Sequence, residues 1–409
     1  MKNGWQKKTL ADVCEIKPPK SEARERLTAD ALVSFAPMED LGIDRKFLNA
    51  TQVKPLASVA GSYTYFADGD VLLAKITPCF ENGKLGVAAS LSNGIGFGSS
   101  EFLVFRPSAS LDKEYLYYYL SRADFRTEGA ARMGGAVGQQ RVSKEFVESY
   151  PIPLPPLHEQ QRIVGLLDKA FEGIATAKAN AEKNLQNARA LFESHLQSVF
   201  TQRGPGWVET RLADICERVS VGHVGPTSEF YCDPSEGIPF LRSQNVRPGK
   251  LDWEGVQYIT KEFHARLRKS QIRFGDLLFV RVGANRGDCC AVLEDVAELN
   301  CANIVFARPT RGNAAYLERY CQSPPGRAQL LGMTTGSAQG VINTKSVAEL
   351  VVPMPKQSDQ EKVVTKLDAL SEETQRLESL YRRKLIALEA LKKSLLHQAF
   401  TGQLTIDNG

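Results

Sequence analysis

The chain repeats itself once, and each copy ends in a long segment with a heptad pattern. The segment LADVCE at Leu10–Glu15 returns as LADICE at Leu212–Glu217, and IPLP at Ile152–Pro155 returns as VPMP at Val352–Pro355. The spacing between copies drifts along the chain, which indicates a divergent duplication and not a short-period solenoid. Two similar units in one chain suit a ligand that has two half-sites, and duplex DNA is the commonest such ligand.

Composition places the chain among ordinary globular proteins. It has 409 residues, which predicts two to four domains, with 43% hydrophobic and 24% charged residues. No apolar run approaches the length of a membrane span, and the N-terminal segment lacks the apolar core of a secretory signal, so we expect a cytoplasmic protein. The eight cysteines show no CxxC spacing, and we expect buried or free thiols. A net charge of +4 permits nucleic-acid binding without requiring it.

Each copy divides into an irregular part and a helical part. We expect globular regions at 1–155 and 204–355, followed by helices at 156–203 and 356–409. The globular regions hold short runs rich in Val, Ile, Phe and Tyr between turn residues, which predicts an α+β (mixed) fold with small mixed or barrel-like sheets. A short helix is predicted at 113–122 in the first region, and its counterpart at 314–323 in the second.

The two helical segments carry apolar residues at alternating steps of three and four. The first seam runs from Ile163 through Leu167 to Val199, and the second from Val364 to Ala399. Each helix would be about 65 Å long at about 1.5 Å per residue, too long to hide its seam in its own globule. We expect the two to pair as an antiparallel coiled coil that relates the copies by a pseudo-twofold rotation. Separate packing of each helix on a partner protein is the alternative.

Motifs for catalysis and cofactor binding are incomplete. His158-Glu159 begins a zinc-protease pattern, but Arg162 stands where its second histidine would be. No GxxxxGK[ST] phosphate loop is present, and the five histidines lack metal-ligand spacing with the cysteines. A duplicated enzyme would usually show its reactive residues twice, and no reactive constellation repeats. We therefore predict no catalytic residues, no metal and no cofactor bound by this chain.

Polar, glycine-rich loops are the features that suit nucleic acid. The loops at 134–145 and 335–346 align between copies, while 240–250 and 281–288 add basic and amide side chains in the second copy. Such side chains grip phosphates and bond base edges. The alternative is a set of surface turns with solvated side chains. The candidate DNA-binding residues are Lys75, Lys84, Gln140, Arg141, Lys144, Arg242, Gln244, Asn245, Arg281, Asn285, Arg286, Gln339 and Lys345.

The order and recurrence of these motifs resemble the specificity (S) subunits of type I restriction-modification systems. The resemblance covers the whole chain. It rests on Trp5 and Trp207 before the repeated Leu-x-Asp segment, on GDVLLAKI and GDLLFVRV, on the Gly/Gln loops leading into IPLP and VPMP, and on the paired long helices.

The resemblance implies that each globular region is a target-recognition domain that reads one half of a bipartite DNA sequence. The helices would fix the distance between half-sites and dock two methyltransferase (modification) subunits. Those subunits would use S-adenosylmethionine, and restriction subunits would use ATP and Mg, so this chain would be non-catalytic. Two alternatives remain: a bivalent protein scaffold that does not touch DNA, and a self-contained methyltransferase or nuclease.

Overall fold

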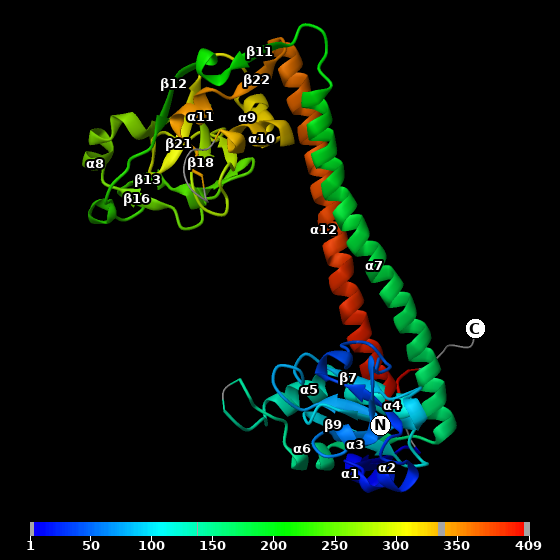
Figure 1. Cartoon of the computed structure of the whole chain (residues 1–409). Helices are drawn as coiled ribbons and strands as arrows, with labels where there is room; N and C mark the ends of the chain where they lie inside the picture. The colour runs from blue at the N-terminus through cyan, green and yellow to red at the C-terminus, as the bar shows by residue number, and fades with distance from the viewer. Residues whose placement is uncertain (1–3, 137, 334–339, 405–409) are drawn as a thin grey trace. The chain divides into compact units, whose positions relative to one another are not determined.

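The computed structural model describes residues 4–136, 138–333 and 340–404. These form two compact units, each described here by itself: unit 1 comprises Met1–Ala181 with Arg383–Gly409, and unit 2 comprises Glu182–Arg382. Each unit contains one globular region and part of each long helix (Figure 1). The division therefore falls within the helices and not at the ends of the globules.

The globule of unit 1 contains two open four-stranded sheets and a two-stranded ribbon. The first sheet has the order β2 (Cys14–Ile16), β9 (Phe102–Pro107), β6 (Val71–Ala74) and β7 (Leu85–Val87). The second has the order β4 (Gln52–Pro55), β3 (Leu32–Ala36), β8 (Ile95–Gly98) and β5 (Thr64–Ala67). The ribbon joins β1 (Gln6–Thr9) to β10 (Pro151–Leu154). All pairings are antiparallel except that of β3 with β8.

Unit 2 repeats this topology strand for strand. Its first sheet has the order β12 (Cys216–Val221), β21 (Ile304–Pro309), β18 (Leu277–Val280) and β19 (Cys289–Ala291). Its second has the order β16 (Gln257–Ile259), β13 (Ile238–Leu241), β20 (Leu299–Cys301) and β17 (Gln271–Ile272), with β13 and β20 parallel. β11 (Val208–Arg211) pairs with β22 (Val351–Met354). The predicted duplication is confirmed. The described sheets are open, so the structure has the small mixed sheets that were predicted and not barrel-like ones.

Short helices and turns complete both globules. In unit 1 they are α1 (Leu10–Val13), α2 (Ser21–Arg26), η1 (Met38–Asp40), α3 (Leu56–Val59), η2 (Ser92–Gly94), α4 (Lys113–Leu120), α5 (Ala123–Ala130) and α6 (Lys144–Ser149). In unit 2 they are η3 (Leu212–Ile215), η4 (Ser228–Phe230), η5 (Ser243–Asn245), α8 (Lys261–Arg266), η6 (Arg268–Ser270), α9 (Ala314–Gln322), α10 (Pro324–Gly332) and α11 (Thr344–Ala348), beside the small ribbon β14 (Val246–Arg247) and β15 (Lys250–Leu251). The predicted helices at 113–122 and 314–323 are α4 and α9.

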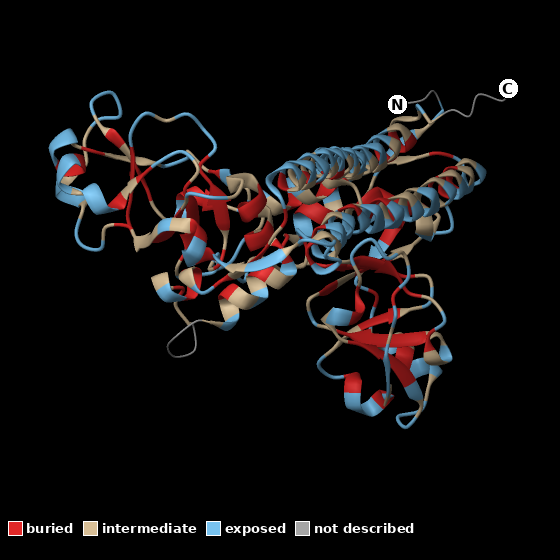
Figure 2. Ribbon diagram, turned by 90° about the horizontal axis from the view of Figure 1, so that it is seen from above, coloured by how far each residue is buried: buried red, intermediate tan, exposed pale blue. Residues whose placement is uncertain are grey.

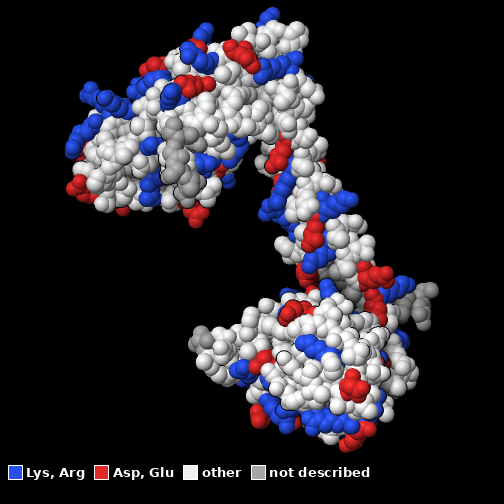
Figure 3. Space-filling model, viewed as in Figure 1, with Lys and Arg blue, Asp and Glu red and all other residues white. Residues whose placement is uncertain are grey.

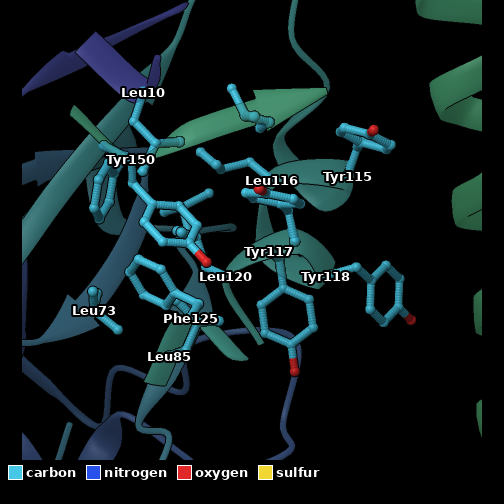
Figure 4. Packing of buried hydrophobic residues seen from close by; sticks show 14 of the residues in the cluster. Leu10, Leu73, Leu85, Tyr115, Leu116, Tyr117, Tyr118, Leu120, Phe125 and Tyr150 are labelled. Carbon is cyan, nitrogen blue, oxygen red and sulfur yellow. The ribbon is translucent and has the colours of Figure 1, made fainter. Parts of the chain in front are cut away.

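The first sheet of unit 1 packs on α4. Asp112 caps this helix by accepting the backbone N–H groups of Glu114 and Tyr115, which satisfies donors that the first turn leaves free. The helix then buries its tyrosine and leucine side chains against strand residues such as Leu73 and Leu85 (Figure 4). Asn313 caps α9 in the same way by accepting the N–H of Tyr316.

The aspartate of the repeated Gly-Asp motif forms an ion pair with an arginine of the first sheet in each unit. Asp70 accepts two hydrogen bonds from Arg106, both at 2.9 Å, and Asp276 accepts two from Arg308, at 2.8 and 2.7 Å. Gly69 and Gly275 precede the aspartates with φ of +93° and +85°, a conformation that glycine adopts without strain. Burial raises the pKa of Asp70, and the hydrogen bonds from Arg106 oppose that shift.

Two helices of 45 residues, α7 (Leu157–Thr201) and α12 (Gln357–Thr401), confirm the prediction from the heptad pattern. In unit 1, Lys178 of α7 pairs with Glu389 of α12 at 2.7 Å; in unit 2, Arg189 pairs with Glu378 at 3.0 Å. Within unit 1 alone, Arg162 of α7 also donates to the carbonyl of Leu404, just beyond α12, so the partner number falls as the first rises and the helices are antiparallel. Seam residues are more buried than the surfaces around them (Figure 2).

The seam departs from the predicted heptads at two steps. At the step assigned to His195, the neighbouring Leu196 is buried and His195 is exposed. Leu391 is also exposed, although the pattern places it in the seam. Near the helix ends the globules replace the partner helix as the packing surface, so the local geometry selects a different residue.

The end of each long helix packs on the tyrosines of a short helix. In unit 1, Phe400 meets the rings of Tyr115 and Tyr119, both with centroids 5.0 Å apart. In unit 2, Phe200 meets Tyr316 and Tyr320 at 5.5 and 5.2 Å. Each core therefore includes the end of the helix that starts from the other copy of the repeat.

Candidate nucleic-acid interface

The loop after β6 in unit 1 is joined to the strand-like segment before α6. The N–H of Thr77 donates to the carbonyl of Gln140, and the N–H of Val142 donates to the carbonyl of Lys75, both at 2.9 Å. Arg141 forms isolated antiparallel bridges with Ile76 and with Gly134. The structure thus brings Lys75 next to Gln140 and Arg141, which lie far from it in the sequence.

Arg141 is anchored by a residue that the sequence did not single out. Its guanidinium donates two hydrogen bonds to Glu101, at 2.9 and 2.8 Å. These bonds lower the pKa of the Glu101 carboxyl and raise the pKa of Arg141, so both groups are charged at neutral pH. A bidentate pair fixes the orientation of the guanidinium. Forty residues separate the partners, and no local pattern could have found Glu101.

The other predicted residues of unit 1 lie near this backbone contact, and their side chains differ in the partners that they have. The Nζ atoms of Lys75 and Lys84 donate to backbone carbonyls, at Ser100 (3.0 Å) and Met38 (2.8 Å). Lys144 is exposed and pairs with Glu148 at 3.1 Å within α6. The half-buried side-chain amide of Gln140 has no hydrogen-bond partner among the described residues, so it is free to bond a ligand.

Unit 2 has the same backbone joint with different side chains. The N–H of Ile342 donates to the carbonyl of Arg281 at 3.1 Å, which matches the bond from Val142 to Lys75. The Arg286 guanidinium donates to the carbonyl of Gly340 at 2.7 Å and holds the loop after β18 beside this segment. Asn285 is exposed at the loop tip, and Lys345 is 79% exposed. Gln339 lies outside the described residues.

A second loop of unit 2 surrounds η5. Arg242 and Gln244 donate to the carbonyl of Gly255, at 3.4 and 3.3 Å. Asn245 is 0% exposed: its Oδ1 accepts the N–H of Arg242, and its Nδ2 donates to the carbonyls of Asp252 and Glu254. The prediction that Asn245 contacts DNA therefore disagrees with its position. Its amide matches the hydrogen-bonding needs of a buried turn, and it shapes the loop that carries Arg242 and Gln244.

The loops after β6 and β18 share a position in the fold, and the η5 loop shares their kind of side chains. In both units, basic and amide side chains stand where the central strand of the first sheet (β6 or β18) ends. The scaffold below them is the same, while the exposed groups differ. Such an arrangement can present hydrogen-bond donors to phosphates and base edges. Among the residues described, we find no cluster of three or more His, Cys, Asp or Glu side chains that could hold a metal. No described helix is long and apolar enough to cross a membrane.

Comparison with known proteins gives a consistent result. Residues 2–186 match the family model described as the type I restriction modification DNA specificity domain. The chain is 39% identical over 168 residues to the type I restriction enzyme EcoEI specificity subunit of Escherichia coli, covering 41% of this chain and 27% of that protein. It is 24% identical over 326 residues to the EcoBI specificity subunit of the same species, covering 72% of this chain and 66% of that protein. The first of these matches thus spans about a quarter of its relative's length.

Two solved structures share the fold along almost the whole chain. One, from a study of complex assembly and conformational transition of the type I R-M system, has a TM-score of 0.79 and 20% identity and covers 98% of this chain and 99% of its own. The other is the HsdS subunit of Thermoanaerobacter tengcongensis, with a TM-score of 0.68, 19% identity and 98% coverage of both chains. At these identities the likeness shows the fold.

Proposed function

We propose that the chain, which resembles type I restriction-modification specificity subunits in sequence and in fold, reads a bipartite DNA sequence. Each globular region would act as a target-recognition domain for one half-site. The single observation that carries this proposal is the pair of globules with one topology and different polar loops. A repeated scaffold with divergent contacts suits two half-sites of different sequence.

The long helices would fix the gap between the half-sites. The antiparallel pairing in unit 1, the ion pair between the helices in unit 2, and the packing of Phe200 and Phe400 at the helix ends support this role. A coiled-coil seam resists bending and sliding because each apolar side chain has a fitted position on the partner helix.

The remaining parts of the proposal rest on the family. The helices would dock two methyltransferase subunits, which use S-adenosylmethionine, and restriction subunits would join with ATP and Mg. This chain would supply recognition without catalysis or a cofactor of its own, in the cytoplasm, where the DNA target lies.

A salt titration tests DNA recognition. The chain with its methyltransferase partner is titrated with target and scrambled duplexes at several salt concentrations. We expect a preference for the target, and log affinity should fall with log salt by about 0.9 per phosphate contacted. A flat slope without target preference, with partner binding intact, would favour the protein-scaffold alternative. Methylation of DNA by this chain alone would favour the self-contained enzyme.

Two further experiments test the separate roles of the globular regions and the long helices: exchange of one region, and lengthening of the helices. Replacing residues 1–155 by the matching region of another family member should change one half-site only. Adding seven residues to each long helix should lengthen the permitted gap by about 10 Å, or about three base pairs, because the helix rises about 1.5 Å per residue and DNA about 3.4 Å per pair. A change in both half-sites after the exchange would contradict the modular assignment.

A further inference from the structure

Unit 2 has an arginine-lined hollow away from the loops described above. Its volume is about 530 Å³, and its lining includes Glu217, Arg218, His264, Arg268, Arg273 and Arg308. It lies where β12 and β17 meet α8 and η6, and Lys and Arg side chains gather on the face that carries α8, with acidic side chains among them (Figure 3). We call it the arginine hollow.

Among the residues that the structure describes, three of its four arginines have guanidinium groups without a hydrogen-bond or ion-pair partner. Arg308 is committed to the buried Asp276, but among the described residues Arg218, Arg268 and Arg273 form no side-chain hydrogen bond or ion pair. Arg218 rests over the ring of Phe306 at 5.3 Å, and its Nε is buried without a hydrogen-bond partner. An unsatisfied buried donor costs about 1–3 kcal/mol, which a bound acceptor would offset.

The charge balance favours an anion. Asp276 cancels Arg308, which leaves three arginines facing the carboxylates of Glu217 and Glu298. Glu298 stands 3.7 Å from the Nε2 of the buried His264, whose ring also meets the amides of Gln271 and Asn300. The net charge is positive even with His264 neutral, so a proton on His264 is not required.

Arg106, the counterpart of Arg308 in unit 1, has two further carboxylate neighbours. On the edge strand of unit 1, Glu15 lies opposite Arg106, whereas in unit 2 Arg218 lies opposite Arg308, with a bulge at the intervening residue. Arg106 also pairs with Glu22 at 2.6 Å in addition to Asp70. In unit 1 the paired arginine thus has two further carboxylate neighbours, whereas in unit 2 it has a second arginine opposite it and Glu217 nearby.

We propose that the arginine hollow binds a backbone phosphate of the DNA outside the bases read by the loop after β18; this rests on the proposed function. Asp276, which pairs with Arg308 of the hollow, and Arg281 flank β18, so these two residues are about 16 Å apart at about 3.3 Å per residue. Guanidinium groups match phosphate oxygens bidentately. Arg268 and Arg273 are exposed, which suits a phosphate on a polymer better than an enclosed free anion. Such a contact fixes register without reading sequence.

The test compares Arg218→Gln, Arg268→Gln, Arg273→Gln and the triple variant with the unsubstituted complex. Affinity for target and scrambled duplexes is measured at several salt concentrations. For each phosphate that a variant no longer binds, we expect the log–log slope to flatten by about 0.9 and affinity at 0.1 M salt to fall about eightfold, equally for both duplexes. The double variant of the exposed Arg268 and Arg273 keeps the test valid if loss of Arg218 impairs folding.

A charge-matched triple variant, with Lys250, Lys261 and Lys269 changed to Gln, serves as the control. These lysines are exposed in the same unit and do not line the hollow. The proposal is overturned if the arginine triple behaves like this control, or if it alters the preference between duplexes. It is also overturned if inorganic phosphate binds at the hollow while DNA affinity is unchanged. Absence of any DNA binding by the unsubstituted complex would instead defeat the proposed function.

Discussion

The two short helices α4 and α9 occupy the same place in the two globules. Some of their positions carry the same residue in both copies, and others have diverged. Tyr115 and Tyr119 donate to the carbonyls of Pro153 and Pro151, and Tyr316 and Tyr320 donate to those of Pro353 and Val351. Between them, Tyr117 and Tyr118 in unit 1 are replaced by Glu318 and Arg319 in unit 2. The positions that bond the edge ribbon and hold the long helix are repeated. Those that face other neighbours have diverged.

The largest effect should come from removing the aromatic residue at the end of each long helix. Phe200→Ala and Phe400→Ala should each cost about 3–5 kcal/mol, because each ring is buried against two tyrosines. Hydrogen exchange should rise in β12 and β21 for the first variant, and in β2 and β9 for the second. Phe274→Ala, which removes an exposed ring, is the control and should change stability by under about 0.5 kcal/mol. If both variants lost protection from exchange in the same sheet, the assignment of Phe200 to unit 2 and Phe400 to unit 1 would be contradicted.

Replacing the aspartate of each buried ion pair should lower the free energy of unfolding by different amounts in the two units. Asp276→Ala leaves Arg308 buried without a carboxylate and should cost about 3–5 kcal/mol in urea unfolding. Asp70→Ala should cost less, about 1–3 kcal/mol, because Arg106 is more exposed and keeps Glu22. Fluorescence of Trp5 reports on unit 1, and that of Trp207 and Trp253 on unit 2. An equal or larger cost for Asp70→Ala would show that the acids of unit 1 do not compensate.

The stability costs of replacing Gln160 and Gln360 should differ by a smaller amount. Each accepts from the N-cap residue of α4 or α9 at 2.8 Å and donates to a proline carbonyl, but Gln160 also donates to Ser110 at 2.9 Å. Replacement by Ala should cost about 1–3 kcal/mol in each, with Gln160→Ala costing about one hydrogen bond more. Amide exchange of Asp112 and Asn313 measures the effect, with the exposed Gln161→Ala as control. A larger cost at Gln360 would contradict this ranking.

The smallest effect concerns pH. Burial raises the pKa of Glu318 above its usual value, and the hydrogen bond from the N–H of Ala291 opposes this. The folded state therefore holds the proton more tightly, so the contribution of Glu318 to stability is present below pH 4.5 and declines as pH rises through the folded pKa. Glu318→Gln should remove this decline in urea unfolding of unit 2 and leave unit 1 unchanged. An unaltered pH profile would exclude Glu318 as its source.

Local patterns predicted the elements, and long-range contacts decided the rest. The heptads located α7 and α12, because periodicity reports burial directly. The short runs rich in Val, Ile, Phe and Tyr between turn residues located β6, β9, β18 and β21. The tether of Arg141 to Glu101 and the inward turn of Asn245 depend on partners that only the fold brings close. The sequence also did not predict that Arg106 and Arg308 have different neighbours, because those neighbours come from separate strands and turns.

The placement of Phe200 and Phe400 has a consequence for truncated chains. A polypeptide ending near residue 203 would carry the tyrosine face of α4 but lack the phenylalanine that covers it. Its own Phe200, made for an equivalent face, would be left exposed. Two such half-length molecules could cover each other's tyrosines, whereas one alone would expose its core to water and aggregate. The 409-residue chain joins both interlocking halves covalently, so neither depends on meeting a second copy.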